Sequence, residues 1–379
     1  MKFNIEKREI STLTALVHRA ASNKSTIPVL SGLHISIDPE TGLTMTATDM
    51  EIGIKASTTN VDVVEAGSVL VNAAYFADFI RLLPDTIISF ELNKEASKLN
   101  ISYGRSSSKL NIYLESEYPD LPISKMEHKV TIPQDILKEG LRKTSFAAAA
   151  NHFRQVFTGV LFDQMPGGVM KIVASDTHRL AYYTCALEKQ DIESFKFVIP
   201  IRTVNEIMRF LEDSPEPINI ATSENNVIFY KEDVLLLSRL IEGQYPNYES
   251  VIPANFTTEI NVKTKILASS LGRAKTMPTD DKFQIQHVQF ILQQQEAILN
   301  SYSESMGEIS EVIEDIEIQG ETDLKIAFNT NYFLDAIKIF ESECDSVIIK
   351  FSGALSPALI KNPEKENYLY ILVPMRTNN

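Results

Sequence analysis

Two residues that could carry chemistry, Asp176 and His178, are separated by one position in the segment S-D-T-H-R. A carboxylate beside an imidazole can bind a metal ion or act as an acid–base pair. However, V-A-S-D, which ends at Asp176, matches T-A-T-D, which ends at Asp49, and no histidine follows there. This match favours a structural role for the aspartate in a turn. The sequence also contains no P-loop, G-x-G-x-x-G, clustered metal ligands or nucleophile elbow, so we predict a non-enzyme with no metal and no cofactor.

Basic residues form a second set, because one recurs at the same position of three similar segments. The segment I-P-I-R-T-V-N-E-I-M-R-F-L begins at Ile199, and related segments begin 128 residues earlier and 129 residues later. Their eleventh residues are Arg81, Arg209 and Lys338. Each segment predicts an amphipathic helix with one apolar stripe, formed in the middle copy by Val204, Ile207, Met208 and Leu211. Arg202 and Arg209 fall on the opposite, polar face. One such cation is an ordinary solvated charge, but its recurrence indicates a shared role.

Further matches show that the whole chain is repeated. T-G-V-L-F matches S-G-L-H-I, and Q-Y-P-N-Y matches E-Y-P-D-L, both at a shift of 127 residues. This period is too long for a solenoid and fits three domains of one fold. We expect domains at 1–125, 126–254 and 255–379, with the third more diverged.

Each repeat is predicted to contain a strand, a helix and further strands, twice over. In the first repeat we expect a strand at Lys2–Ile5, a helix from about Arg8 to Ala21, and a strand at Leu30–Ile37. An alternating stretch follows at Leu43–Ala56, then a second helix from about Ala74 to Leu83, which Pro84 ends. Because each helix has one apolar side, both must pack on one face of a sheet. The fold class is therefore α+β, with two helices on a sheet per domain.

Two helices side by side would present their polar faces together. The recurring cations of the second helices would then be joined by basic residues of the first helices, namely Arg19, Arg142, Lys143, Arg273 and Lys275. The net charge of −14 does not exclude an anionic partner, because binding depends on where the basic residues lie.

Composition gives the broad class. The chain has 379 residues, 44% of them hydrophobic and 23% charged, as in a soluble globular protein. No apolar run approaches the roughly 18 residues of a membrane span, and the charged N-terminus has no signal-peptide pattern. The two cysteines lie in different repeats, so no disulfide framework is expected. We therefore expect a cytoplasmic protein without a membrane partner.

Several motifs in order resemble the bacterial DNA polymerase III beta subunit family, over the whole chain. They are M-K-F-x-I, T-I-P-V-L-S-G-L, T-A-T-D-M-E, E-Y-P-D-L-P, S-D-T-H-R-L-A, E-G-Q-Y-P-N-Y and L-V-P-M-R. The resemblance implies three copies of the DNA clamp fold per chain. Two chains would form a six-domain ring that encircles duplex DNA, slides on it and tethers the replicative polymerase. The basic residues above would face phosphates without reading the sequence, and the resemblance adds Lys24, Asn151 and Arg154.

The resemblance also implies a pocket for a short peptide of client proteins, between the second and third domains. Its matching residues are Phe157, Ser175, Thr177, His178, Arg179, Leu180, Pro246, Ser250, Val251, Asn329, Tyr332, Ile371, Val373, Pro374, Met375 and Arg376. His178 and Arg179 correspond to Glu51 and Ile52 in the first repeat, so this pair is specific to the second domain. The family often has glycine at Thr177 and arginine at Ser250, which predicts a narrower and less basic pocket.

Dimer contacts are likewise implied by the resemblance, through pairing of the first domain's edge strand with the partner's third domain. The matching residues are Lys109, Leu110, Asn111, Ile112, Thr276 and Met277. Expected partners are a second copy, double-stranded DNA, the polymerase, the clamp loader and other proteins with a clamp-binding motif. In this bacterial family the protein would associate with the nucleoid during replication. The alternative function is a protein-binding scaffold of three pseudo-repeats that does not encircle DNA.

Overall fold

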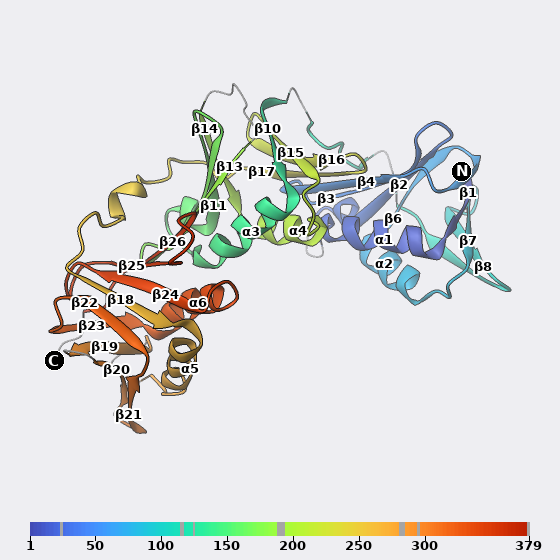
Figure 1. Cartoon of the computed structure of the whole chain (residues 1–379). Coiled ribbons are helices and arrows are strands. Elements are labelled where there is room, and N and C mark those ends of the chain that lie inside the picture. The colour runs from blue at the N-terminus through green and yellow to red at the C-terminus, as the bar shows by residue number, and fades with distance from the viewer. Residues whose placement is uncertain are drawn as a thin grey trace. The chain divides into compact units, whose positions relative to one another are not determined.

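The computed structural model describes residues 1–22, 26–113, 117–123, 126–187, 194–279, 285–293 and 296–376. The chain divides into two compact units (Figure 1). Unit 1 comprises Met1–Lys138 and Arg202–Leu240, and unit 2 comprises Glu139–Ile201 and Ile241–Asn379. Each unit contains two antiparallel sheets, and the middle of the chain contributes to both units.

Unit 1 holds a five-stranded sheet in the order β5-β1-β7-β8-β9 and an eight-stranded sheet in the order β10-β15-β16-β17-β4-β3-β2-β6. Its elements are β1 (Lys2–Glu6), α1 (Lys7–Val17), β2 (Gly32–Asp38), β3 (Gly42–Thr48), β4 (Ile52–Thr58), β5 (Asp62–Glu65), β6 (Gly67–Asn72), α2 (Ala73–Leu82), β7 (Ile87–Asn93), β8 (Lys98–Tyr103), β9 (Ser106–Asn111), β10 (Glu127–Pro133), α4 (Ile201–Phe210), β15 (Pro217–Ser223), β16 (Asn226–Lys231) and β17 (Val234–Arg239). Helix α3 (Gln134–Thr144) begins in unit 1 and ends in unit 2.

Unit 2 holds a nine-stranded sheet in the order β14-β11-β12-β13-β26-β25-β24-β18-β22 and a four-stranded sheet in the order β21-β20-β19-β23. Its elements are β11 (Gly159–Met165), β12 (Val169–Ser175), β13 (Arg179–Ala186), β14 (Phe195–Pro200), β18 (Thr258–Lys263), α5 (Thr264–Ala274), β19 (His287–Gln293), β20 (Glu296–Ser303), β21 (Gly307–Ile313), β22 (Ile316–Gly320), β23 (Leu324–Asn329), α6 (Thr330–Glu341), β24 (Ser346–Phe351), β25 (Ala358–Lys361) and β26 (Tyr368–Leu372).

Two sheets run continuously from one repeat into the next. In unit 1, β17 of the middle repeat pairs antiparallel with β4 of the first, and Ser238 lies opposite Ile52. In unit 2, β13 of the middle repeat pairs antiparallel with β26 of the third, and Arg179 lies opposite Leu372. These pairings explain why the compact units do not follow the sequence repeats. The same two strand positions of the repeat form both junctions.

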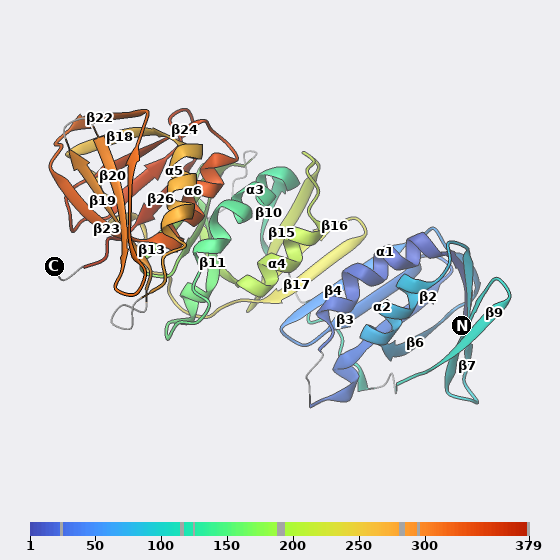
Figure 2. The same ribbon diagram turned by 90° about the horizontal axis from the view of Figure 1, so that it is seen from below.

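The predicted apolar stripes are buried in the second helix of each repeat. In α4, Val204 and Ile207 are fully buried, and in α6 Phe333 and Ile337 are almost fully buried. In unit 1, α1 and α2 contact each other and lie side by side over the strands (Figure 2). Helices α5 and α6 contact each other in unit 2. The α+β class with two helices per repeat is confirmed, because each helix buries only one face.

The single strand expected at Leu43–Ala56 is wrong. The structure divides this stretch into β3 and β4, which pair with each other around a turn at Asp49–Glu51. The alternation continues on both sides of the turn, so the hydrophobic pattern does not reveal the reversal. Strands β5 and β6 were also not predicted.

Candidate functional site

The candidate dyad belongs to a tight turn between β12 and β13. The Asp176 carboxylate Oδ1 accepts hydrogen bonds from the backbone N–H groups of His178 (2.9 Å) and Arg179 (3.0 Å). The Ser175 hydroxyl donates to the Arg179 carbonyl at 2.7 Å and accepts from the Thr177 N–H at 3.2 Å. Thr177 has φ of +77°, a conformation that a β-branched residue rarely adopts.

The turn at Asp49 has the same hydrogen bonds. The Asp49 Oδ1 accepts from the N–H groups of Glu51 (3.0 Å) and Ile52 (2.9 Å). The Thr48 hydroxyl donates to the Ile52 carbonyl at 2.9 Å, and Met50 has φ of +75°. The structural turn role predicted for the aspartate is therefore confirmed. Within the described residues, no group of three or more His, Cys, Asp or Glu side chains could hold a metal ion.

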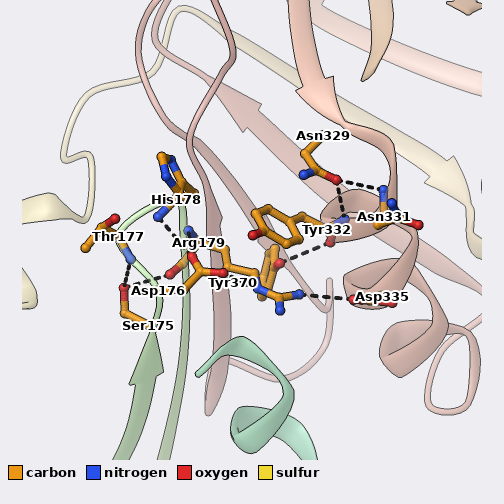
Figure 3. Close-up of polar contacts among 10 residues, drawn as sticks. All are labelled: Ser175, Asp176, Thr177, His178, Arg179, Asn329, Asn331, Tyr332, Asp335 and Tyr370. Atoms are coloured by element: carbon orange, nitrogen blue, oxygen red, sulfur yellow. Dashed lines mark hydrogen bonds and ion pairs between the residues drawn. The ribbon is translucent and has the colours of Figure 1, made fainter. Parts of the chain in front are cut away.

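Arg179 connects this turn to helix α6. Its Nε donates to Asp176 Oδ2 and its Nη1 to Asp335 Oδ2, both at 3.0 Å (Figure 3). The guanidinium also stacks 4.1 Å from the centroid of the Tyr332 ring. Burial lowers the pKa of Arg179, but Tyr370 and the carboxylates raise the pKa more, so it remains charged. Arg179 is therefore a fixed wall, with its donors already paired with carboxylates.

A cavity of about 220 Å³ lies beside this turn in unit 2. Its floor is part of an apolar cluster that includes Leu180, Tyr248 and Ile371. Nine of the residues predicted for the client pocket line it together, namely Phe157, Ser175, Thr177, Arg179, Leu180, Pro246, Val251, Ile371 and Val373. Such a small apolar hollow with a few polar groups can accept one or two apolar side chains of a ligand.

The other predicted pocket residues do not line this cavity; they are His178, Ser250, Asn329, Tyr332, Pro374, Met375 and Arg376. Asn329 instead caps α6, because its Oδ1 accepts from the N–H groups of Asn331 and Tyr332 at 2.9 and 3.2 Å. The His178 carbonyl accepts from the Val373 N–H at 2.9 Å, which ties the turn to the end of β26.

Four lining residues were missed by the sequence analysis: Tyr245, Asn247, Tyr248 and Pro357. Three of them lie in the motif Q-Y-P-N-Y, whose match to E-Y-P-D-L could have drawn attention to them. Tyr248 is buried and donates to Asp163 Oδ2 at 2.7 Å, and burial raises its pKa above the ordinary value. Pro357 precedes β25 and had no sequence signal.

The three recurring cations are exposed, but their surroundings differ. Arg81 pairs with Asp78 at 3.1 Å and Arg209 with Glu206 at 3.5 Å, each three residues earlier in its helix. Lys338 has Asp335 at the same spacing, but Asp335 binds Arg179. Among the described residues, Lys338 therefore makes no ion pair and has the least neutralised charge of the three.

The remaining predicted cations divide into free and paired side chains. Arg19, Lys275, Asn151 and Arg154 are exposed. Arg202 is bound by the Asp49 carboxylate, Arg142 pairs with Glu343 at 2.7 Å, and Arg273 pairs with Glu311 at 2.5 Å. Lys24 lies outside the described residues. Paired arginines attract an anion less strongly than a free one, because their carboxylate partners oppose it.

The prediction that Lys143 faces solvent is wrong. Its side chain is 0% exposed and its Nζ lies 2.6 Å from Glu139 Oε1 and 2.8 Å from Glu343 Oε2. The Nζ is also 5.3 Å from the ring centroids of both Tyr183 and Tyr368. Position in the last turn of α3 suggested a polar face, but a carboxylate and an aromatic side chain of the third repeat cover that position.

No helix in the described part of the chain is long and apolar enough to cross a membrane. The architecture is that of a clamp: three repeats of two helices on antiparallel sheets, with sheets continuing across the repeat junctions. Sequence models of the DNA polymerase III beta subunit match in three parts, the N-terminal domain at residues 1–122, the central domain at 131–247 and the C-terminal domain at 249–376. The chain therefore belongs to the DNA polymerase III beta subunit family, as the sequence predicted.

Similar proteins carry the same description. The beta sliding clamp of Bacillus subtilis is 31% identical over 385 residues, which cover 100% of both chains. That of Halalkalibacterium halodurans is 32% identical over 370 residues, covering 95% of this chain and 96% of the relative. The crystal structure of the B. subtilis DNA polymerase sliding clamp superposes with a TM-score of 0.92 at 30% identity over 100% of each chain. The beta subunit from Thermotoga maritima gives 0.89 at 26% identity, also over 100% of each. These likenesses favour a sliding clamp over a non-encircling scaffold.

Proposed function

We propose that two copies of this chain close into a ring around duplex DNA and serve as a processivity factor without catalytic activity. The proposed domains are 1–125, 126–254 and 255–379. The observation that carries the ring is the strand pairing at the two repeat junctions within the chain. A third junction of the same kind needs a second copy, because its two strands are edge strands of separate sheets.

The strands in question are β9 and β21. In position along the repeat, β21 corresponds to β4 and β13, and β9 corresponds to β17 and β26. The latter four all pair at the junctions, whereas β9 is bonded only to β8 and β21 only to β20. An unpaired edge strand is a ready template for a strand of another chain. Two such contacts, related by a twofold axis, close a ring.

The register of the third junction follows from the other two. Carrying over the pairing of Ile54 with Leu236 places Ser108 opposite Ile309 and Lys109 opposite Glu308 of the second copy. A directly opposed Lys–Glu pair stabilises antiparallel strands, whereas a like pair would oppose pairing. This supports the proposed interface at Lys109, Leu110 and Asn111. Ile112, Thr276 and Met277 remain proposed neighbours of it.

Disulfide cross-linking tests the ring contact. The same register places Ser107 opposite Ser310, so a chain carrying Ser107→Cys and Ser310→Cys, with Cys344→Ser, should give a covalent dimer on mild oxidation. The control pair, Ser107→Cys with Glu314→Cys, is displaced by four residues, about 13 Å, and exceeds the roughly 7 Å limit of a disulfide. Light scattering should also give twice the 42.5 kDa of one chain. A persistent monomer at micromolar concentration would refute the ring.

The basic side chains are proposed to guide the DNA backbone. Exposed cations such as Arg81, Arg209, Lys338 and Lys275 would contact phosphates without reading bases. Many weak contacts of this kind permit sliding, while ring closure prevents escape. We propose the same location for Arg19, Lys24, Arg142, Asn151, Arg154, Arg202 and Arg273. The protein would act in the cytoplasm at the nucleoid.

The cavity of unit 2 is proposed to receive a short motif of the polymerase, the clamp loader and other clients. A fluorescein-labelled pentapeptide with leucine and phenylalanine anchors is a suitable probe. Val251 is half-exposed on the cavity wall, so Val251→Asp should weaken peptide binding at least about ten-fold while leaving the fold intact. The matched control is Val64→Asp, at an exposed position of β5 away from the cavity. Equal peptide affinity of both variants would refute this pocket.

A further inference from the structure

The loop at residues 148–158 presents an aromatic side chain that the proposed contacts leave unexplained. Phe153 is 87% exposed, the highest value among the large apolar side chains that the structure describes. Its ring stacks on His152 with a centroid distance of 4.5 Å and an interplanar angle of 28°. Exposure of so large an apolar ring is unfavourable in water, which suggests a binding role.

Hydrogen bonds hold this loop in one conformation. The Arg154 N–H donates to His152 Nδ1 at 3.0 Å, so the neutral imidazole carries its proton on Nε2. The Ala149 N–H donates to the Phe157 carbonyl at 2.8 Å. The His152 ring also meets Phe157 edge to face, with centroids 4.8 Å apart. The two stacked rings therefore form a supported platform.

The chemistry around the platform matches a nucleobase. A hollow of about 530 Å³ is lined by Ala150, Asn151, His152, Phe153, Gln155 and Thr158. The amides of Asn151 and Gln155 can both donate and accept hydrogen bonds, as base edges require. Residues 148–158 include Arg154 and no acidic residue, although the whole chain has a net charge of −14. An anionic ligand with aromatic faces fits this combination.

We infer that the 148–158 loop binds an unpaired nucleobase of single-stranded DNA. The base stacks on Phe153, its polar edge meets Asn151 or Gln155, and the adjacent phosphate pairs with Arg154. Bases inside a duplex have both faces covered by their neighbours, so duplex DNA cannot use the platform in this way. The inference goes beyond encirclement, which requires only contacts with the duplex backbone.

Fluorescence gives a direct test, because the chain contains no tryptophan. Phe153→Trp introduces a single reporter, whose emission should be quenched by dT₁₂ and much less by a 12-base-pair duplex. In anisotropy titrations of labelled dT₁₂ at low salt, Phe153→Ala should bind about ten-fold more weakly than the unaltered protein. Phe153→Trp should retain the affinity. The control Leu82→Ala removes another exposed apolar side chain, at the end of α2, and should change nothing.

Equal dT₁₂ affinity of Phe153→Ala and the unaltered protein would overturn the inference. Weaker binding of the client pentapeptide by Phe153→Ala, with unchanged dT₁₂ binding, would also overturn it and assign the platform to peptide recognition. Neither result would affect ring closure, which the cross-linking of Ser107 and Ser310 reports independently. Loss of cross-linking with intact dT₁₂ quenching would instead refute the ring alone.

Discussion

Replacing Lys143 by methionine should destabilise unit 2 by about 3 kcal/mol. Methionine keeps the volume of the side chain, so the loss comes from the charge. The buried ammonium neutralises Glu139 at 2.6 Å and Glu343 at 2.8 Å. Removing one partner of a buried ion pair costs about 3–5 kcal/mol. The low end applies because Glu343 keeps Arg142 at 2.7 Å and Glu139 keeps the Tyr183 hydroxyl at 3.0 Å.

Differential scanning calorimetry at pH 7 measures this effect. For a unit of about 200 residues, each kcal/mol shifts the melting temperature by about 2–4 °C, so Lys143→Met should melt about 6–12 °C lower. The control Lys275→Met removes an exposed charge and should stay within about 0.5 kcal/mol. Adding Glu139→Gln to Lys143→Met should recover part of the loss. Equal melting of Lys143→Met and the control would contradict the buried ion pair.

Three further predictions follow from the same structure. Burial raises the pKa of Glu139, but the hydrogen bond and charge of Lys143 outweigh burial and set the pKa below 4.5; this stabilisation is complete above about pH 4.5 and is lost as pH falls through the folded value. Urea unfolding from pH 6 to 3 should therefore show the difference between the unaltered protein and Lys143→Met shrinking with acid, and a constant difference would refute the coupling. Thr177→Gly should raise the melting temperature, by about 0.5–1 kcal/mol of stability, because φ of +77° strains a β-branched residue; a lower melting temperature would contradict this. Lys338→Gln should weaken retention on duplex DNA more than Arg81→Gln, because Asp78 already neutralises Arg81; filter binding at several salt concentrations would show the reverse order if pairing were irrelevant.

The repeats made most of the fold predictable from the sequence. Matching segments at nearly constant spacing identified three equivalent units, and the apolar stripes identified the buried face of α4 and α6. The comparison of Asp49 with Asp176 also gave the correct role for the aspartate, because a turn common to two repeats cannot depend on a histidine present in one. The boundary between β3 and β4 was not predictable, since alternation continues across the Asp49 turn.

The site was less predictable, because side-chain partners from other repeats decide it. Lys143 and Arg142 are neighbours in the sequence, yet Lys143 is fully buried and Arg142 is exposed. Lys338 and Arg81 occupy equivalent positions, yet only Arg81 is paired with the acidic residue three positions earlier. Pro357 reaches the cavity from a loop without any motif. These outcomes depend on contacts between segments far apart in the chain.

Retention on circular DNA tests encirclement most directly. After loading onto nicked circular DNA, the protein should co-elute with the circle in a salt concentration that suppresses ordinary phosphate contacts. Cutting the same DNA once should release it, because a ring slides off a free end. Equal retention on the circular and linear forms would show that the protein binds DNA without encircling it.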